Sequence, residues 1–327
     1  MTQTSVFAPI YAISPHRVCT DGFGVTTLVG LYGCPLRCKL CINPNSQQIP
    51  NNARVLTPQQ LFDEVKHDDI LYRATNGGIT FGGGEPCLYP EFIKQFSSLC
   101  PSNWNIRIET SLNVPAENIL SLLSSVDEWF VDIKLWNIEK YRDYTGKDNH
   151  NVLQNLEYLL PIKEKVIIRV PIIEGLTNDT DADRVEQELL GIGFMNIQKD
   201  RYLNPQDILT NRKRDCITVR YVRQAIAKRY NIEIDDPLCP IEICQSGTCE
   251  KCEEILRSLE VKLVGKEIEN DAIDVSHLLP NGDGIYFAPF GDICDDECFF
   301  GSKYGFGHYE KDEKGGFGVE IVSTGFP

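Results

Sequence analysis

The sequence predicts an α/β fold in which short buried strands alternate with helices, and three observations support this prediction. Several apolar runs are rich in Val, Ile and aromatic residues without regular polar alternation, which is typical of strands buried on both faces of a parallel sheet. The segments between them repeat apolar residues at spacings of three and four, as amphipathic helices do. Strand and helix alternate about six times between residues 20 and 235, which implies right-handed crossovers and either a barrel or an open α/β sheet.

The individual elements follow in order along the chain. The predicted strands cover residues 25–32, 78–81, 105–110, 129–136, 165–173 and 195–203. The first helix is predicted to start after Thr57, because this residue can cap the helix, Pro58 suits its first position and Gln60 completes a capping box. Further helices are predicted at residues 116–126, 151–160 and 181–193.

The sequence changes character near residue 235, where we predict a domain boundary. Of the formal net charge of −15, residues 236–327 carry −12 and residues 1–235 carry −3. The second part contains a helix candidate at 250–259 and possible strands at 284–291 and 317–322, and we expect a small irregular domain packed on the first. A nucleic-acid-binding protein would show a basic stripe, so the acidic balance disfavours that class.

Hydropathy and cysteine usage indicate the compartment. No run of eighteen apolar residues is present and the first ten residues lack the pattern of a signal peptide, so we expect a cytoplasmic protein without membrane segments. The thirteen cysteines fall into two tight groups plus single residues. In a reducing compartment, such groups indicate metal or redox chemistry rather than disulfides.

Three cysteines lie together in the loop YGCPLRCKLCINP, which follows the first predicted strand. Iron–sulfur cubanes normally take four cysteine ligands, so Cys34, Cys38 and Cys41 would leave one iron open to a small molecule. An α/β fold places its ligands at this end of the strands. The alternative is a zinc site that takes its fourth ligand from His16 or Cys19.

Several motifs in series resemble those of radical S-adenosylmethionine (SAM) enzymes, and most closely those of the glycyl-radical-enzyme activases, such as the activators of pyruvate formate-lyase. CPLRCKLC fits the Cys-x-x-x-Cys-x-x-Cys pattern of the superfamily. The other matching segments are DGFGVTTLVGLYGC, NGGITFGGGEP with its Gly-Gly-Glu-Pro motif, VDIKLWNIEKYRDYTGKDN with Asp-x-Lys and Tyr-Thr-Gly, and IIRVPIIEGLTND with Arg-Val-Pro. The resemblance covers about residues 18–205.

The resemblance implies a fold and a chemistry. The fold is a partial (β/α)6 radical SAM barrel at residues 1–235, followed by a small cysteine-containing C-terminal domain at residues 236–327. The three loop cysteines would hold a [4Fe–4S] cluster, and SAM would chelate its open iron. One electron from a flavodoxin- or ferredoxin-type donor would then cleave SAM to a 5′-deoxyadenosyl radical, which removes a hydrogen atom from a protein or peptide substrate.

The resemblance also assigns SAM contacts to the ends of the strands. Gly83, Gly84 and Glu85 would meet the methionyl amino group through backbone atoms and the glutamate side chain. A simple tight glycine turn is the alternative for this segment. Arg169 would bind the SAM carboxylate with its forked donors, unless it forms a structural salt bridge.

Two acidic residues and a lysine complete the set of implied contacts. Glu109 and Asp132 close the third and fourth strands, and Asp132 and Lys134 would share one strand face. In the activases the matching acids help to bind SAM directly or through a monovalent cation, and aspartate stands where this chain has Glu109. The alternative is that both acids neutralise Lys134 and Arg169.

The chain departs from the family pattern at two places. Leu40 stands directly before the third cysteine, where many members have an aromatic residue that packs near adenine. The histidine that usually follows the sixth strand is missing from residues 202–209, and Asn204 is its candidate replacement. These changes make the identity of the substrate less certain than SAM binding.

A second group of four cysteines lies in CPIEICQSGTCEKC, namely Cys239, Cys244, Cys249 and Cys252. Four soft ligands can hold either zinc or a second iron–sulfur cluster, and their spacing does not separate the two. We favour an auxiliary iron–sulfur cluster over structural zinc, with unliganded thiols as the third interpretation.

Three other cysteines have no clear role. Cys294 and Cys298 form a looser pair that we interpret as structural, with a distant metal ligand or a hydrogen-donating thiol as the alternatives. Cys87 follows the Gly-Gly-Glu-Pro motif close to the expected site, without a visible partner.

The sequence therefore predicts a radical SAM oxidoreductase that abstracts hydrogen from a protein or peptide, with a glycyl-radical-enzyme activase as the first interpretation. A maturase of a ribosomally made peptide, carrying an auxiliary cluster, is the strong alternative, and a small-molecule enzyme is the third. A non-enzymatic zinc-binding protein is the alternative from another class. The acidic C-terminal segment could select a basic partner or cover the site.

Overall fold

A computed structural model describes residues 6–18, 21–173, 177, 179–201, 213–237, 250–266, 273, 308–311 and 317–320. Several features singled out in the sequence lie outside these residues: Cys19, Asn204, Cys239, Cys244, Cys249, Cys294, Cys298 and the strand candidate at 284–291. The fold and the site are therefore built from the first two thirds of the chain and from short later segments.

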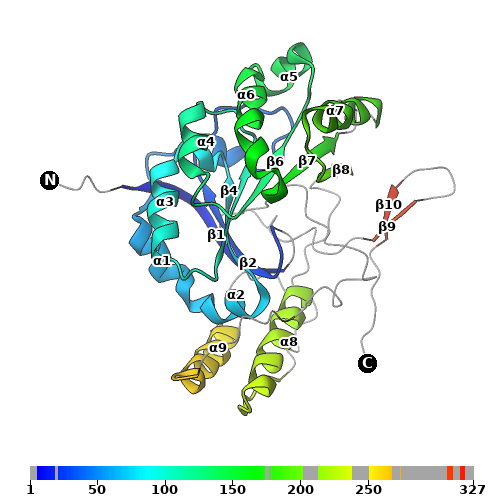
Figure 1. Cartoon of the computed structure of the whole chain (residues 1–327). Coiled ribbons are helices and arrows are strands. Elements are labelled where there is room, and N and C mark those ends of the chain that lie inside the picture. Colours follow the sequence, from blue (N-terminus) through cyan, green and yellow to red (C-terminus); the bar gives the residue numbers. More distant parts are fainter. Residues whose placement is uncertain are drawn as a thin grey trace.

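Six parallel strands form the centre of the fold (Figure 1). They lie side by side in chain order: β2 (Val25–Leu31), β4 (Gly78–Gly83), β5 (Asn105–Thr110), β6 (Glu128–Asp132), β7 (Val166–Ile172) and β8 (Ile197–Arg201). Each strand overlaps its predicted range, and β8 ends the sheet without pairing back to the first strand among the described residues. The predicted partial (β/α)6 barrel is confirmed, and its six carboxyl ends share one edge.

Two antiparallel strands extend the sheet beyond β2 and were not predicted from the sequence. β1 (Ala8–Val18) pairs with β2, and β3 (Arg54–Leu56) pairs with β1. β1 contains two prolines and His16 at a φ of 59°, and its register against β2 shifts at two places. These irregularities remove the alternation by which a strand is found, because proline and bulges otherwise signal a loop.

Helices connect the parallel strands and cover the sheet. The α-helices are α1 (Pro58–Val65), α2 (Asp69–Thr75), α3 (Pro90–Leu99), α4 (Ala116–Leu122), α5 (Ile138–Thr145), α6 (His150–Leu159), α7 (Asp179–Ile192), α8 (Lys213–Arg229) and α9 (Glu250–Leu263). Short 3-10 helices lie at η1 (Pro44–Gln47), η2 (Lys66–Asp68), η3 (Pro86–Leu88) and η4 (Leu160–Lys165), and β9 (His308–Lys311) pairs with β10 (Phe317–Glu320). Within the described segments, no helix combines the length and apolar character needed to cross a membrane.

The start of α1 follows the predicted capping box. The Thr57 hydroxyl accepts a hydrogen bond from the backbone N–H of Gln60 at 3.2 Å, and the Gln60 side chain accepts one from the N–H of Thr57 at 2.9 Å. Two backbone donors at the helix start are thereby satisfied, which fixes where the chain enters the helix.

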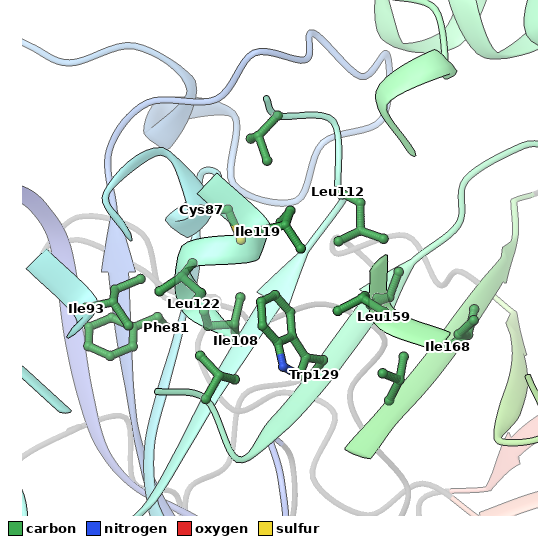
Figure 2. Packing of buried hydrophobic residues seen from close by; sticks show 14 of the residues in the cluster. Phe81, Cys87, Ile93, Ile108, Leu112, Ile119, Leu122, Trp129, Leu159 and Ile168 are labelled. Carbon is green, nitrogen blue, oxygen red and sulfur yellow. The ribbon is translucent and has the colours of Figure 1, made fainter. Parts of the chain in front are cut away.

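The main core lies between the sheet and the helices that connect its strands (Figure 2). Phe81 of β4 packs edge-on against Phe92 and Phe96 of α3, with ring centroids 6.5 and 5.3 Å apart. Trp129 of β6 and Ile108 of β5 are also fully buried in this cluster. Every residue of β2 and β7 is buried, which explains why these strands show continuous apolar runs.

A second apolar cluster lies where β2 begins, at the end of the sheet opposite the carboxyl edge. Leu256 and Leu259 of α9 pack there with Val222 and Ile226 of α8 and with Val25 of β2. Figure 1 shows α8 and α9 together at this end, next to α2. Part of the acidic C-terminal segment therefore packs directly on the barrel, while the domain boundary at residue 235 stays a prediction.

We predict a pH dependence of stability from the packing of α9. Glu260 of α9 is half-buried, and burial together with the charges of Asp69 and Asp68 raises its pKa to about 7, against the opposing effect of Arg257. A carboxyl with a higher pKa in the folded than in the unfolded chain stabilises at low pH, and that stability is lost as the pH rises from about 4.5 to about 7. Glu260→Gln should therefore flatten the dependence and raise the free energy of unfolding at pH 8 by about 1 kcal/mol, since solvent screens part of the charge.

Urea titrations at pH 5 and pH 8 measure this effect. Glu254→Gln on the same helix is the matched control, because Glu254 is exposed, and it should behave as the wild type does. Equal slopes of stability against pH for the wild type and Glu260→Gln would show that the pKa of this carboxyl is not raised in the folded chain and would contradict the prediction.

Candidate functional site

A cavity open to solvent lies at the carboxyl ends of β2, β4, β5 and β6, where a parallel α/β sheet places its ligands. Its volume of about 690 Å³, mouth included, falls in the range of small-molecule sites. Eight of the predicted cofactor and metal contacts line this cavity: Cys34, Cys38, Cys41, Gly83, Gly84, Glu109, Asp132 and Lys134. The fold thus brings together side chains from four separate parts of the chain.

The three loop cysteines are partly buried free thiols. Burial, followed by the charge of Glu85, raises the pKa of Cys34 to about 12. Burial raises the pKa of Cys38 to about 11, with the nearby Lys134 ammonium opposing the shift. These two thiols are therefore protonated at neutral pH, and a metal must release their protons as it binds.

The glycine run at the end of β4 allows its backbone to lie directly against the cysteine loop. Gly83 has a φ of +88°, and a Cβ at Gly84 would lie 2.3 Å from the carbonyl oxygen of Gly33, next to Cys34. The N–H of Gly84 donates to Leu31 O at 2.9 Å. Only glycine fits this close approach, so both glycines have a structural role whatever they bind.

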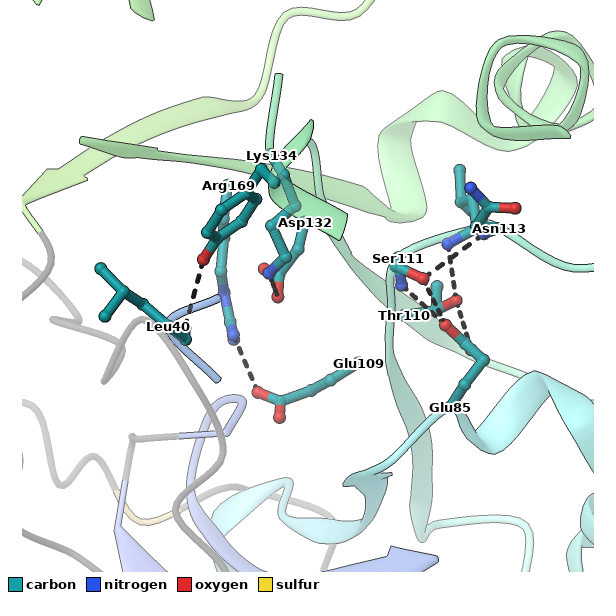
Figure 3. Close-up of polar contacts among 11 residues, drawn as sticks. Leu40, Glu85, Glu109, Thr110, Ser111, Asn113, Asp132, Lys134 and Arg169 are labelled. Atoms are coloured by element: carbon teal, nitrogen blue, oxygen red, sulfur yellow. Dashed lines mark hydrogen bonds and ion pairs between the residues drawn. The ribbon is translucent and has the colours of Figure 1, made fainter. Parts of the chain in front are cut away.

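The Glu85 side chain points away from the cavity, into the structure behind it. Its carboxylate is 1% exposed and accepts hydrogen bonds from the hydroxyl groups of Thr110 and Ser111, both at 2.7 Å, and from the N–H groups of Ser111 and Cys87 at 3.0 and 3.2 Å. The three contacts with Thr110 and Ser111 join the end of β4 to the end of β5 (Figure 3), while the contact with Cys87 caps η3. A SAM contact at this residue would therefore come from its backbone, and the predicted side-chain contact stays a prediction.

Two ion pairs lie at the floor of the cavity (Figure 3). Arg169 donates from Nη1 to Glu109 Oε1 at 2.8 Å and lies 4.4 Å from the ring centroid of Phe130, while Lys134 Nζ donates to Asp132 Oδ2 at 2.8 Å. Arg169 itself does not line the cavity, whereas Glu109 does. The structure thus shows the pairing that the sequence left as the alternative, in which each acid neutralises a buried base.

The charged surroundings change the acidity of Lys134, Arg169 and Glu109. Burial disfavours the charged form of Lys134, but Asp132 and the neighbouring cysteines outweigh it and raise the pKa of this lysine. Burial also disfavours the charged form of Arg169, but Glu109 and Asp132 outweigh it and raise the pKa of this arginine. Burial raises the pKa of Glu109 to about 7, although Arg169 works in the opposite direction. The charge states of Glu109, Lys134 and Arg169 therefore depend on their charged neighbours.

The donor set fits an iron–sulfur cluster with a polar ligand beside it. Asp132 Oδ1 is buried and accepts no hydrogen bond from the part of the chain that the structure describes, so an acceptor is available at the cavity wall. Among the described residues, no three His, Cys, Asp or Glu side chains converge as the ligands of one metal ion would. In a cubane each cysteine binds a different iron, so its ligands are spread around the cluster.

His16, the proposed fourth ligand of a zinc site, lies elsewhere. Its Nε2 is 2.8 Å from Asp68 Oδ1, and it does not line the cavity. The pairing with Asp68 raises the pKa of His16 although burial alone would lower it. The structure therefore gives no support for a zinc site in which His16 is the fourth ligand beside the three loop cysteines.

Among the cavity residues to which the sequence gave no role, Tyr144 reaches the cysteine loop. Tyr144 of α5 lines the cavity, and its hydroxyl donates to the carbonyl oxygen of Leu40 at 3.2 Å. Leu40, which stands where an aromatic residue was expected, is 47% exposed. The Tyr-Thr-Gly segment was noted in the sequence, but only the fold shows that its tyrosine reaches the cysteine loop.

Comparisons with known proteins show what the chain is similar to. The family model of the radical SAM superfamily matches residues 28–186. The pyruvate formate-lyase 2-activating enzyme of Escherichia coli (strain K12) is 31% identical over 207 residues, covering 54% of this chain and 70% of that protein. The pyruvate formate-lyase-activating enzyme of Staphylococcus epidermidis is 31% identical over 184 residues, with 54% and 71% covered. The (2S)-3-sulfopropanediol dehydratase activating enzyme of Klebsiella oxytoca is 25% identical over 255 residues, with 56% and 80% covered.

A partial α/β barrel with three cysteines at its carboxyl edge defines an enzyme of the radical SAM class. The chain belongs to the radical SAM superfamily, and within it the chain resembles the glycyl-radical-enzyme activating enzymes. The family implies a [4Fe–4S] cluster and SAM as cofactors. The alternative of a non-enzymatic zinc-binding protein is left without support.

We predict that the Glu85 side chain stabilises the apoprotein and does not bind SAM. In Glu85→Gln, the amide nitrogen would face donors at Thr110 or Ser111, so we expect the free energy of unfolding to fall by about 2–3 kcal/mol. Glu91→Gln on the exposed side of α3 is the control and should change it by less than about 0.5 kcal/mol. Urea unfolding of both apoproteins measures the change. Unaltered stability together with a weaker affinity for SAM would instead establish a side-chain contact to the cofactor.

Proposed function

We propose that this chain activates a glycyl radical enzyme, by cleaving SAM reductively and removing a hydrogen atom from a glycine of its partner protein. The observation that carries the proposal is the shared cavity, in which three cysteines that could hold an open cubane face the acids and the lysine at the ends of β5 and β6. A cluster with one open position beside polar ligand contacts is what SAM cleavage requires.

The similar proteins support a protein substrate. The relatives include activating enzymes of two formate-lyases, a sulfopropanediol dehydratase, a choline trimethylamine-lyase and a hydroxyphenylacetate decarboxylase. The enzymes they activate catalyse different reactions, whereas activation of a partner enzyme is common to all their names. We therefore propose a protein partner for this chain and leave the reaction of that partner open.

The residues in and next to the cavity would have different roles in binding the cluster and SAM. Cys34, Cys38 and Cys41 would hold the cluster, and the free oxygen of Asp132 would accept a hydrogen bond from the amino group of SAM. Arg169, already charged and buried, would offer its guanidinium to a carboxylate. When bound, the cluster and SAM supply the one-electron chemistry that yields methionine, 5′-deoxyadenosine and a radical on the substrate.

Electrons would come from a flavodoxin- or ferredoxin-type protein. Each turnover consumes one electron, which cleaves SAM, and the hydrogen atom taken from the substrate ends on 5′-deoxyadenosine. The three-cysteine loop borders a cavity that opens to solvent, so a small electron-transfer protein could approach the cluster there. We therefore expect the donor and the protein substrate to use the same end of the barrel.

The proposed activity predicts a radical on a partner protein. Anaerobically reconstituted protein with SAM and dithionite should form 5′-deoxyadenosine, and addition of its partner glycyl radical enzyme, sought among the neighbouring genes, should give a glycine-centred signal in electron paramagnetic resonance. Cys34→Ala should abolish both, because one cluster ligand is lost. Cys100→Ala, which changes a partly buried cysteine at the end of α3, is the control and should retain both.

Deoxyadenosine without any radical on the partner would contradict the activase role and leave SAM cleavage standing. In that case, modification of a short precursor peptide would favour the maturase alternative. Failure to form deoxyadenosine from the iron-loaded wild type would contradict the proposed function as a whole.

We also propose a second metal site at the C-terminal cysteines, with an iron–sulfur cluster preferred to zinc. Of the four, Cys252 lies in the described part of the chain, half-buried on α9 and close to Arg223.

Cys239→Ala should lower bound iron from about eight to about four per chain, since one of two cubanes loses a ligand. Iron, sulfide and zinc analysis of wild type, Cys239→Ala and Cys100→Ala measures this. Loss of zinc with constant iron would identify a zinc site, and no loss of either metal would contradict the proposal.

A further inference from the structure

The cysteine loop is held in place from two sides. Residues 32–43 form no helix or strand, so hydrogen bonds from other segments must determine their positions. At the start of the loop, the N–H groups of Gly33 and Cys34 donate to the carbonyls of Ser46 and Gln47 at 2.7 and 3.2 Å. These contacts are local, and they fix the first cysteine alone.

The remainder of the loop is held by the last turn of α5, more than a hundred residues away in the chain. The N–H of Arg37 donates to Thr145 O at 2.7 Å, and the N–H of Lys39 donates to Tyr144 O at 3.0 Å. The Tyr144 hydroxyl donates to Leu40 O at 3.2 Å. These three bonds lie on either side of Cys38 and end directly before Cys41, so they fix the second and third cysteines relative to the barrel.

The end of α5 is suited to this role. The last carbonyls of a helix have no partner inside it and are free to accept from another segment. Gly146 ends the helix in the left-handed conformation at a φ of 76°, and its N–H donates to Arg142 O at 2.9 Å. The carbonyls of Tyr144 and Thr145 are thereby left for the loop.

The helix itself is anchored to the barrel. Asn113, just beyond β5, donates from Nδ2 to the Tyr141 hydroxyl at 3.1 Å and to Asp148 O at 2.6 Å. Asn137 caps the start of the helix by accepting from the N–H groups of Glu139 and Lys140, both at 3.0 Å. The position of α5 is therefore set from both ends, and the helix can pass that position on to the loop.

We propose that the last turn of α5 is a clamp that positions Cys38 and Cys41 for the cluster, and that Tyr144 is its positioning residue. Tyr144 is 2% exposed and contacts the loop through both its carbonyl and its hydroxyl. The exposed ion pair of Lys39 with Asp143, at 2.8 Å, adds little because solvent screens it. The proposal rests on the cluster belonging to this loop and not on the activase role.

The clamp can be tested with Tyr144→Phe, which removes the hydroxyl and keeps the ring. In the apoprotein, we expect amide hydrogen exchange over residues 35–41 to accelerate about three- to tenfold, the range for one lost hydrogen bond. In the reconstituted protein, loss of iron to a chelator should accelerate by a similar factor of about three to ten. The KM for SAM should rise more than kcat falls, because a shift of Cys38 and Cys41 would displace the cluster and its open iron while the chemistry is unchanged.

Two further variants separate the clamp from a general loss of structure. Tyr158→Phe on α6 is the matched control, because this tyrosine does not line the cavity, and it should behave as the wild type does. Tyr144→Leu removes the ring as well and should increase the exchange of the loop further. Exchange of residues 138–144 within α5 should stay as slow as in the wild type for Tyr144→Phe.

Unchanged exchange of residues 35–41 in Tyr144→Phe would overturn the proposal. Equal acceleration in the loop and throughout α5 would also overturn it, because Tyr144 would then stabilise its own helix only. The exchange is measured without cofactors, so a failure of the proposed function would leave this result unaffected.

Discussion

The site depends on one buried carboxylate at the junction of three segments. The N–H of Glu85 donates to Gly33 O at 2.7 Å, directly before the first cysteine, while its side chain accepts from Thr110 and Ser111 at the end of β5. A buried carboxylate is costly unless hydrogen bonds replace its water. Four donors do so here, and as a result β4, β5 and the cysteine loop have one relative arrangement. The strand ends that form the cavity are therefore fixed before any cofactor arrives.

The charges around the cavity are balanced in pairs, and this suits a ligand that carries both signs. Glu109 neutralises Arg169, and Asp132 neutralises Lys134, so burying these groups leaves no net charge. The amino acid end of SAM has one ammonium and one carboxylate. Under the proposed function, this end would enter as a neutral zwitterion and exchange partners with these pairs, and its amino group would lose a proton on binding the open iron. Charged groups that are already held in place can bind a charged ligand without reorienting, whereas water molecules would have to reorient around it.

The sequence was most informative where strand order and spacing determine position. Buried runs such as residues 25–32 and the Cys-x-x-x-Cys-x-x-Cys spacing predicted the sheet, the edge at which the cavity lies and its three cysteines, whereas the family resemblance implied the five other predicted residues that line it. β1 was missed because its prolines and shifted register remove the alternation of a strand. The direction of the Glu85 side chain and the reach of Tyr144 could not be predicted, because both depend on contacts between distant segments that no local pattern records.

Cys252 and the three-cysteine loop lie at opposite ends of the barrel. Cys34 follows the last residue of β2, whereas Cys252 lies on α9, which packs with Val25 at the first residue of the same strand. Seven residues of strand at about 3.3 Å each separate the two ends by roughly 20 Å. A metal held through Cys252 would thus be too far away to contact SAM or the substrate in the cavity. Its effect on catalysis would have to pass through the stability of the α8 and α9 packing or through electron transfer across the barrel.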